Sequence, residues 1–453
     1  MGKNLNRKIE QTPGLGSTEA AKNRKNPADI YKNLIFHFRP RAVKKKTLDF
    51  TLTFGLGGMA FVLLLILFAT GLLMKVHYLP FPDRAYESVI YLSREVLFGG
   101  LIRNIHFWSA NILIIVAFLH FLRVFFTSAF HHPRRLNWII GLGLFIIIMS
   151  FNFTGYLLPW NQLSYWAITI CAGTMDYVPG IGQWIKSLAG IDTELGASTL
   201  SVFYSVHTGW LPALLILVIP FHFWRVRKAG GLVSAGTGRR RDESPDLRVS
   251  AMPGLFLREL TVALSLIAIV LLISIFFNAP YGIKANPGLS PDPAKAPWYF
   301  LGFQEMLLHF HPFTAVFVIP LLIITGLAVI VRRKYSSGSE GIWLISPTGR
   351  KTAAASFIIA LLITPPAVFM DEYILDFEGR MPGLLPVISN GLIPLCLVMF
   401  IYAAVHFVLK KIYSPGKNEA VQMTFVFFLT AFVILTVTGI WFRGSGMKLA
   451  WPG

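Results

Sequence analysis

The sequence predicts an all-α polytopic membrane protein, with a four-helix bundle followed by about four to five further transmembrane helices. Hydrophobic residues make up 54% of the 453 residues and charged residues only 14%, whereas soluble domains contain about 25% charged residues. Long uncharged runs recur along the chain, and about 20 apolar residues are enough to cross a bilayer. The charged residues gather in the N-terminal segment and in the loops between these runs.

Nine uncharged or nearly uncharged runs are predicted to span the bilayer. Basic residues follow every second run, such as Arg134 and Arg135 after the second and Arg225 after the fourth. With a cytoplasmic N-terminus all of these clusters lie on the inner side, as the positive-inside rule requires. The runs cover residues 51–74, 104–122, 136–158, 200–224, 256–278, 312–331, 353–370, 385–409 and 421–442.

The net charge of +19 follows the same topology. Residues 1–46 hold twelve Lys and Arg against three Asp and Glu, and residues 225–250 hold seven against three. We therefore expect an integral protein of a bacterial inner (cytoplasmic) membrane, in contact with lipid and with no nucleic acid partner. The predicted segments are a basic cytoplasmic tail (1–46), a four-helix domain (47–228), a cytoplasmic linker (229–254), a second half (255–335) and additional transmembrane helices (336–453).

The second and fourth predicted helices each carry two histidines. His106 and His120 are fourteen residues apart, and His207 and His222 are fifteen apart. At about 1.5 Å and 100° per residue, either spacing places both imidazoles near one face, about 21 to 22 Å apart along the axis. A lone histidine in an apolar helix is usually a hydrogen-bonded core residue. Two nearly matching pairs in adjacent helices instead favour two non-covalent b-type haems, each with two imidazole ligands to its iron.

The predicted topology also pairs the histidines. Both helices run from outside to inside, so His106 pairs with His207 near the outer side and His120 with His222 near the inner side. The one-residue difference in spacing rotates one ligand by about 100°, which a local change of helix pitch or a tilt of the haem must absorb.

Glycines and arginines next to these histidines are further candidates for cofactor binding. Small residues also serve ordinary helix packing, but a repeat of the histidine spacing favours room for two flat porphyrins. Arg103 and Arg123 lie three residues from a ligand and are candidates for binding haem propionates, and snorkelling to the interface is compatible with that role. The glycines form two pairs that are fourteen residues apart, Gly57 with Gly71 and Gly141 with Gly155.

Three segments carry a family resemblance: RNIHFWSAN (Arg103–Asn111), TGYLLPWNQLSYWA (Thr154–Ala167) and FYSVHTGWLP (Phe203–Pro212). Through them, residues 35–232 resemble cytochrome b of the quinol-oxidising cytochrome bc complexes. The fifteen-residue histidine spacing is more similar to the chloroplast type than to the mitochondrial type. Beyond the linker, APWYFLGFQEML (Ala296–Leu307) resembles the quinol-site loop of subunit IV. The resemblance therefore implies a dihaem half and a subunit IV-like half fused in one chain.

The resemblance implies a cytochrome b subunit that oxidises quinol outside and passes one electron through the two haems to quinone inside, coupled to proton translocation. The other electron would go to a Rieske-type iron–sulfur protein, because Cys171 and Cys396 cannot bind such a cluster. A cytochrome c subunit or domain and a homodimer are also implied. By position, the outer quinol site would contain Tyr156 and Tyr299 as catalytic residues, lined by Pro159, Trp160, Pro179, Pro297 and Trp298.

Two positions depart from the family pattern. The usual Pro-Glu-Trp-Tyr is Ala296-Pro297-Trp298-Tyr299 here, so the carboxylate that accepts a quinol proton is missing. Glu305, about two helical turns after Trp298, is a catalytic replacement or else a carboxylate that faces the outer aqueous boundary. Chloroplast-type proteins attach an extra haem to a cysteine where this chain has Gly55, so we expect no covalent haem.

A second functional class remains open from the residues alone. A dihaem b membrane anchor would link quinone to an attached dehydrogenase and would use the same histidine pairs. The APWY loop and the TGYLLPW segment favour the bc-type interpretation.

Overall fold

The structure, a computed structural model, describes residues 42–233, 248–332 and 341–451. Within those ranges nine helices are long and apolar enough to cross a membrane. They confirm the predicted all-α polytopic fold and its nine spans, with ends that differ by a few residues. The helices are α2 (Leu56–Lys75), α4 (Gly99–Phe126), α5 (Arg135–Leu157), α8 (Ala197–Ser205) continued by α9 (Leu211–Lys228), α10 (Gly254–Phe276), α12 (Ile319–Val329), α13 (Pro347–Tyr373), α15 (Ile393–Tyr413) and α16 (Lys417–Trp441). α12 reaches the length of a span together with the helical turns on either side of it, over Thr314–Arg332.

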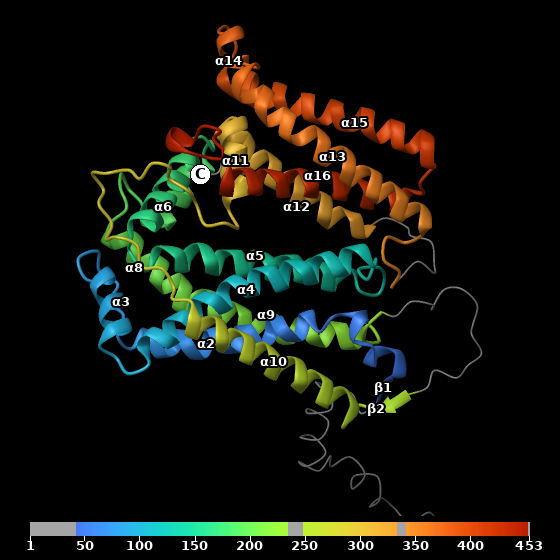
Figure 1. Ribbon diagram of the computed structural model, residues 1–453, viewed down its shortest axis with the longest axis horizontal. Helices are drawn as coiled ribbons and strands as arrows, with labels where there is room; N and C mark the ends of the chain where they lie inside the picture. The colour runs from blue at the N-terminus through green and yellow to red at the C-terminus, as the bar shows by residue number, and fades with distance from the viewer. Residues whose placement is uncertain (1–41, 234–247, 333–340, 452–453) are drawn as a thin grey trace, which may run out of the picture.

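The spanning helices run side by side in two layers (Figure 1). In the first layer α2 packs on α4, α5 packs on α9, and α10 packs on both α4 and α2. In the second layer α16 packs along α13, and α13 packs on α15. Aromatic rings join the layers, because the buried Phe125 of α4 lies 4.3 Å, centroid to centroid, from the partly buried Phe425 of α16.

Short helices, for which the sequence analysis gave no bounds, lie between the spanning helices. In Figure 1, α3, α6 and α11 lie at the left-hand end of the bundle. The short α-helices are α3 (Ala85–Arg94), α6 (Gln162–Met175), α7 (Ile181–Leu188), α11 (Leu301–His309) and α14 (Phe377–Arg380). Single 3-10 turns occur at Lys45–Leu48, Phe50–Leu52, Ile330–Arg332 and Ser445–Met447.

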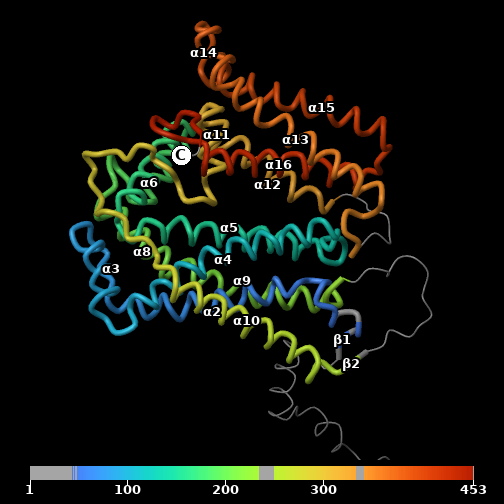
Figure 2. The backbone as a smooth tube through the Cα atoms, in the orientation of Figure 1, coloured from blue at the N-terminus to red at the C-terminus, as the bar shows by residue number. Residues whose placement is uncertain are grey.

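The opposite end of the bundle carries the strands. β1 (Ala42–Lys44) pairs antiparallel with β2 (Arg248–Ser250), with Ala42 opposite Ser250. Figure 2 follows the chain through both strands, at the end of the molecule far from α3 and α6. The pairing ties the start of the first span to the segment that precedes α10. Residues 1–41 of the predicted tail and residues 234–247 of the predicted linker lie outside the described residues.

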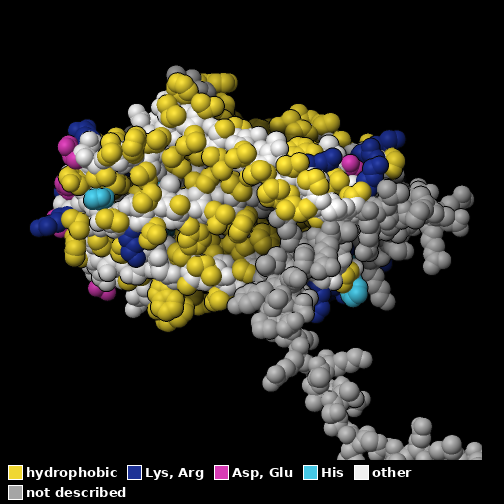
Figure 3. All heavy atoms as spheres, turned by 90° about the horizontal axis from the view of Figure 1, so that it is seen from below, with side chains coloured by type: hydrophobic (Ala, Val, Ile, Leu, Met, Phe, Trp, Pro, Cys, Tyr) yellow, Lys and Arg dark blue, Asp and Glu magenta, His cyan; other side chains and the backbone are white. Residues whose placement is uncertain are grey.

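The surface has the distribution expected of a protein in a bilayer. Hydrophobic side chains cover the middle of the face in Figure 3, and charged side chains lie mainly at its two ends. Leu65 and Leu72 of α2, for example, are 53% and 70% exposed. Helices that are apolar on the outside as well as the inside are stable where lipid replaces water.

Candidate functional site

The four predicted ligand histidines form two pairs at opposite ends of the first layer. The imidazole rings of His106 on α4 and His207, which precedes α9, have centroids 6.4 Å apart and planes at 61°. At the other end, His222 of α9 lies close enough to His120 of α4 to influence its charge. All four residues are half-buried between the helices. The structure therefore brings together the pairs that the sequence predicted.

A π-helical turn (Val206–Trp210) accounts for the unequal histidine spacing. It contains His207, and the amide of Leu211 donates to the carbonyl of Val206, five residues back instead of four. The next residue, Pro212, has no amide hydrogen and clashes with an ordinary turn, which favours the wider one. The extra residue is thus absorbed before α9 begins. Two further π-helical turns, Thr314–Val318 and Ile388–Leu392, also precede an Ile-Pro step.

Each of the four predicted glycines faces one of the four histidine rings. A Cβ placed on Gly71 would lie 3.3 Å from Cε1 of His106, and one on Gly155 would lie only 2.5 Å from Cε1 of His207. At the other end the corresponding distances are 3.4 Å from Gly57 to His120 and 3.6 Å from Gly141 to His222. The helices α2 and α5 therefore support the rings of α4 and α9 through positions that have no side chain.

Hydrogen bonds fix the orientation of the first histidine pair. Thr70 donates its hydroxyl to the carbonyl of Ile66 and lies 2.9 Å from Nδ1 of His106. Nδ1 of His207 lies 3.1 Å from the carbonyl of Phe151, which can only accept. Both Nδ1 atoms are thereby assigned the proton, which leaves each Nε2 with a lone pair for a metal. The sequence analysis missed Thr70, although it directly precedes Gly71.

The second pair has different surroundings. Among the described residues, buried Nδ1 atoms of His120 and His222 have no hydrogen-bond partner. The same holds for single buried N–H groups of Arg123, Arg225 and Arg227, although Arg123 also donates from Nε to the carbonyl of Leu52. Buried N–H groups are costly unless paired, so unsatisfied guanidinium groups fit the carboxylates of haem propionates.

Arg103 has a different position from Arg123. Its two terminal nitrogens donate to the carbonyls of Ala279 and Pro280 at 2.9 and 2.6 Å, and its guanidinium lies 4.3 Å from the ring centroid of Tyr281. Arg103 therefore attaches the segment after α10 to the start of α4.

Two of the predicted quinol-site residues, Tyr156 and Tyr299, lie close together where the loop before α11 approaches the end of α5. Tyr156 at the end of α5 lies close enough to Tyr299 to affect its charge. Trp298 donates from Nε1 to Oδ1 of Asn111 on α4 at 2.8 Å. Pro159 and Trp160 form the turn between α5 and α6, where the carbonyl of Trp160 accepts from Ala285. The remaining two prolines lie in other loops, Pro179 before α7 and Pro297 before α11.

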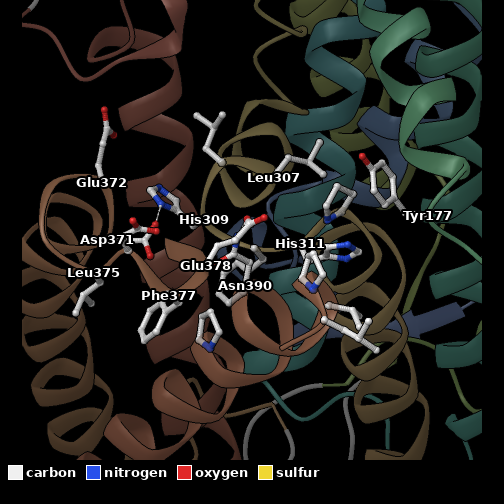
Figure 4. A pocket seen from close by; sticks show the side chains of 18 residues that line it. Tyr177, Leu307, His309, His311, Asp371, Glu372, Leu375, Phe377, Glu378 and Asn390 are labelled. Atoms are coloured by element: carbon white, nitrogen blue, oxygen red, sulfur yellow. Dashed lines mark hydrogen bonds and ion pairs between the residues drawn. The ribbon is translucent and has the colours of Figure 1, made fainter. Parts of the chain in front are cut away.

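Glu305 lies apart from these residues, in a buried ionic cluster. Its carboxylate accepts from Nε of Arg443 at 3.0 Å and lies 3.3 Å from Nε2 of His309. Nδ1 of His309 lies 2.6 Å from Asp371 at the end of α13. Figure 4 shows His309 and Asp371 pointing toward each other at the edge of a cavity of about 720 Å³. Tyr177 and His311 line the other side of this cavity.

The fold and the two histidine pairs together define a membrane-embedded bundle of the cytochrome b type. A family model described as Cytochrome b/b6/petB matches residues 43–230. Cytochrome b6 of Acaryochloris marina (strain MBIC 11017) is 43% identical over 175 residues, which cover 39% of this chain and 81% of that protein. Cytochrome b6 of Trichodesmium erythraeum (strain IMS101) is also 43% identical over 175 residues, covering 39% and 79%. The chain belongs to the cytochrome b/b6 family.

The second half of the chain lies within a region that resembles a solved structure. A solved structure described as Hyperthermophilic respiratory Complex III matches with a TM-score of 0.63 and 23% sequence identity, covering 92% of this chain and 100% of that chain. At this identity the likeness concerns the fold. The predicted resemblance of the first half to cytochrome b is confirmed, and the second half shares the fold of that solved structure.

Proposed function

We propose that this chain oxidises quinol at the outer side of the membrane and delivers one of the two electrons to quinone at the inner side, coupled to proton translocation. The observation that carries the proposal is the hydrogen bond from Trp298 to Asn111, which joins the quinol-type loop to the helix of His106. When bound, two non-covalent b-type haems supply iron centres that each change by one electron. Quinol and quinone are the substrates.

Four histidines would hold the two irons. His106 and His207, here called the outer pair, would bind one, and His120 and His222, the inner pair, would bind the other. The four glycines, Gly57, Gly71, Gly141 and Gly155, keep the neighbouring helices close without a side chain at the rings. Arg123 would meet an inner propionate with its unpaired N–H. We propose that Arg103 binds a propionate of the outer haem. This propionate would compete with the carbonyls of Ala279 and Pro280 for the N–H groups of Arg103.

Two tyrosines are proposed to bind the quinol. Burial and the nearby Tyr156 raise the pKa of Tyr299, so its hydroxyl stays protonated and can hydrogen-bond a quinol oxygen. Tyr156 would bind from the end of α5. The walls of the site would be Pro159, Trp160, Pro179, Pro297 and Trp298.

Glu305 is proposed to take the quinol proton in place of the missing carboxylate of the loop. Burial opposes its ionisation, but hydrogen bonds and charges from His309 and Arg443 outweigh that effect and lower the pKa of Glu305. An ionised carboxylate is the form that can accept a proton. His309 would connect it to Asp371 and the cavity.

The orientation, partners and division of the chain are part of the proposal. Basic clusters at the ends of alternate spans support a cytoplasmic N-terminus in a bacterial inner membrane. A Rieske-type iron–sulfur protein and a cytochrome c subunit or domain would take the other electron, and two copies of the chain would form a homodimer. We propose residues 47–228 as the haem half, 229–254 as the linker and 255–335 as the quinol-site half, flanked by the tail (1–46) and the additional helices (336–453).

Haem quantitation and redox titration of the purified protein test this function. We expect two b haems of unequal potential per chain, reducible by a short-chain quinol such as duroquinol. A reduced spectrum without b-haem bands would refute the proposal. Copurification of a Rieske-type protein would support bc-type electron transfer, whereas copurification of a dehydrogenase would favour a membrane anchor.

A further inference from the structure

The last helix and the segment after it are attached to the loop that carries Trp298 and Tyr299. Nζ of Lys295 in this loop donates to the carbonyl of Ile440 at the end of α16 at 3.0 Å. The amide of Gly446 donates to the carboxylate of Asp292 at 2.5 Å. The C-terminal end of the described chain accordingly lies beside α11 in Figure 1.

The helix that follows the loop is packed tightly against α16. A Cβ on Gly302 of α11 would lie 2.5 Å from Oγ1 of Thr436 and 2.8 Å from the ring of Phe432. A Cβ on Gly439 of α16 would lie 3.2 Å from Cβ of Leu301. The backbone of α11 therefore lies directly against side chains of α16 at Gly302, and the backbone of α16 lies against Leu301 at Gly439, so neither position has room for a larger residue without a shift of the helices.

Arg443 closes this contact from the end of α16. Its side chain is 1% exposed and binds Glu305, whose side chain is fully buried, with Nε at 3.0 Å from both oxygens and Nη2 at 2.5 Å from Oε1. Nη1 binds the carboxylate of Glu372 on α13 and the carbonyl of Met447 at 2.9 Å. A buried, planar guanidinium that binds both oxygens of a carboxylate restricts the helix that carries this carboxylate. It limits both rotation of the helix about its axis and translation along that axis.

We infer that the ninth span and its tail are the positioning element of the quinol loop, and that Arg443 is its key positioning residue. The inference rests on the proposed function of that loop. Tyr299 lies two residues before α11, so the rotation of α11 about its axis decides where Tyr299 and Trp298 point. The loop is held between two anchors, Asn111 of α4 on one side and Arg443 with Lys295 on the other.

The test compares Arg443→Gln and Arg443→Lys with Arg380→Gln in the haem-loaded complex. Arg380 is a matched control, since it is an exposed arginine of α14 whose side chain donates to a local carbonyl, that of Ile374. The readouts are haem content, both haem potentials, and the rate at which duroquinol reduces the haem of the outer pair. For Arg443→Gln we expect unchanged haem content and potentials, with KM for duroquinol raised about tenfold because the binding residues are displaced. The rate at saturating duroquinol is expected to fall as well, because Arg443 also binds Glu305, the proposed proton acceptor. Arg443→Lys is expected to restore part of the loss, and Arg380→Gln is expected to match the wild type.

Lys295→Met provides a second, milder variant that leaves the buried ionic cluster intact. We expect a rise in KM of about threefold, since the contacts of Arg443 and Gly446 remain when that of Lys295 is lost. Wild-type KM in Arg443→Gln would overturn the inference. If Arg443→Gln does not fold, wild-type KM in Lys295→Met would overturn it instead. A wild-type protein whose haems dithionite reduces but duroquinol does not would refute the proposed function itself.

Discussion

The outer and inner histidine pairs each consist of two imidazoles, but the surroundings of the two pairs differ. At the outer end Nδ1 of each ring is engaged, by Thr70 or by the carbonyl of Phe151. At the inner end both Nδ1 atoms lack a partner among the described residues, and unsatisfied arginine N–H groups lie at that end of the chain's helices. Hydrogen bonds thus orient the imidazoles of the outer pair, whereas those of the inner pair have no such bond at Nδ1 and lie at the end of the helices that carries the arginines.

Both differences between the pairs are expected to make the reduction potential of the inner haem higher than that of the outer haem. A hydrogen bond from Nδ1 strengthens an imidazole as a donor and lowers the potential of its iron, whereas nearby cations raise it. With the proposed orientation, electrons move inward against a potential that is negative inside. Crossing two-thirds of a ~30 Å core costs about 1.5 kcal/mol per 100 mV. A higher potential at the inner pair offsets that cost, so the asymmetry matches the proposed direction of transfer.

Removing one ligand should produce the largest effect and test whether the pairs are independent. His222→Ala is expected to abolish the inner haem and leave the outer one, because the outer pair does not contact His222. Haem content per chain would fall by half, and the titration would lose only its high-potential component. Loss of both components would show that the two ends do not assemble separately.

The second largest effect is expected from a glycine-to-alanine substitution, which should affect the outer pair more than the inner pair. Gly155→Ala places a methyl group within 2.5 Å of the outer His207, whereas Gly141→Ala places one at 3.6 Å from the inner His222, an ordinary contact. We expect Gly155→Ala to lose on the order of 1 to 3 kcal/mol of stability by overpacking and to change the outer haem spectrum. Thermal unfolding and low-temperature spectra measure both effects. Equal behaviour of the two variants would contradict the packing difference.

Arg123 tests the electrostatic side of the comparison. Arg123→Gln removes one positive charge at the inner end, and a charge about 10 Å away at an effective dielectric of roughly 20 is worth about 1 to 2 kcal/mol. The inner potential should fall by several tens of millivolts while the outer potential stays constant. A redox titration that resolves both haems measures the two potentials. An equal fall in both potentials would contradict the assignment of Arg123 to the inner haem.

Thr70 tests the hydrogen-bonding side. Thr70→Val removes the acceptor for Nδ1 of His106, and the outer potential should rise by an amount that corresponds to about 1 kcal/mol, the net value of one hydrogen bond. Thr154 lies 3.2 Å from Nδ1 of His207, which also has the carbonyl of Phe151. Thr154→Val should therefore shift the outer potential less than Thr70→Val, and the reverse order would disprove the assigned hydrogen bonds.

The smallest expected effect is a pH dependence confined to the outer end. Burial lowers the pKa of His309, but hydrogen bonds to Asp371 and Glu305 outweigh it and raise the pKa to about 9. Since this lies above the ordinary value, the stabilisation is complete below about pH 6.5 and is lost as the pH rises through about 9. The unfolding temperature should fall between pH 7 and 10, and His309→Gln should flatten that profile. An unchanged slope in the variant would assign the pH dependence to other groups.

The spans and both histidine pairs could be predicted from the sequence, because bilayer thickness and helical periodicity leave few alternatives. His106 and His207 share an end for this reason, and the four glycines are found at the rings that their spacing matches. The role of Thr70 could not be deduced, since a threonine in an apolar helix commonly bonds its own backbone. Pro212, five residues after His207, was the available signal for the wide turn.

The ionic cluster shows a different limit of sequence reasoning. Glu305 was singled out by its distance from Trp298 along one helix, but its partners come from segments 66 and 138 residues further on, Asp371 through His309 and Arg443 directly. Local periodicity carries no information about such contacts. They depend on how α13 and α16 pack on α11, which only the three-dimensional arrangement determines.

The wide turn before α9 bears on the register of two histidines of the fourth span through a proline that is adjacent to neither of them in the sequence. Pro212 lengthens the path between His207 and His222 by one residue, yet both rings still face α4. Chains with one residue fewer between these ligands can therefore hold them in the same relative positions if they lack the wide turn. In a helix that contains a proline, the number of residues between two metal ligands is therefore a poor measure of the distance between the two metals.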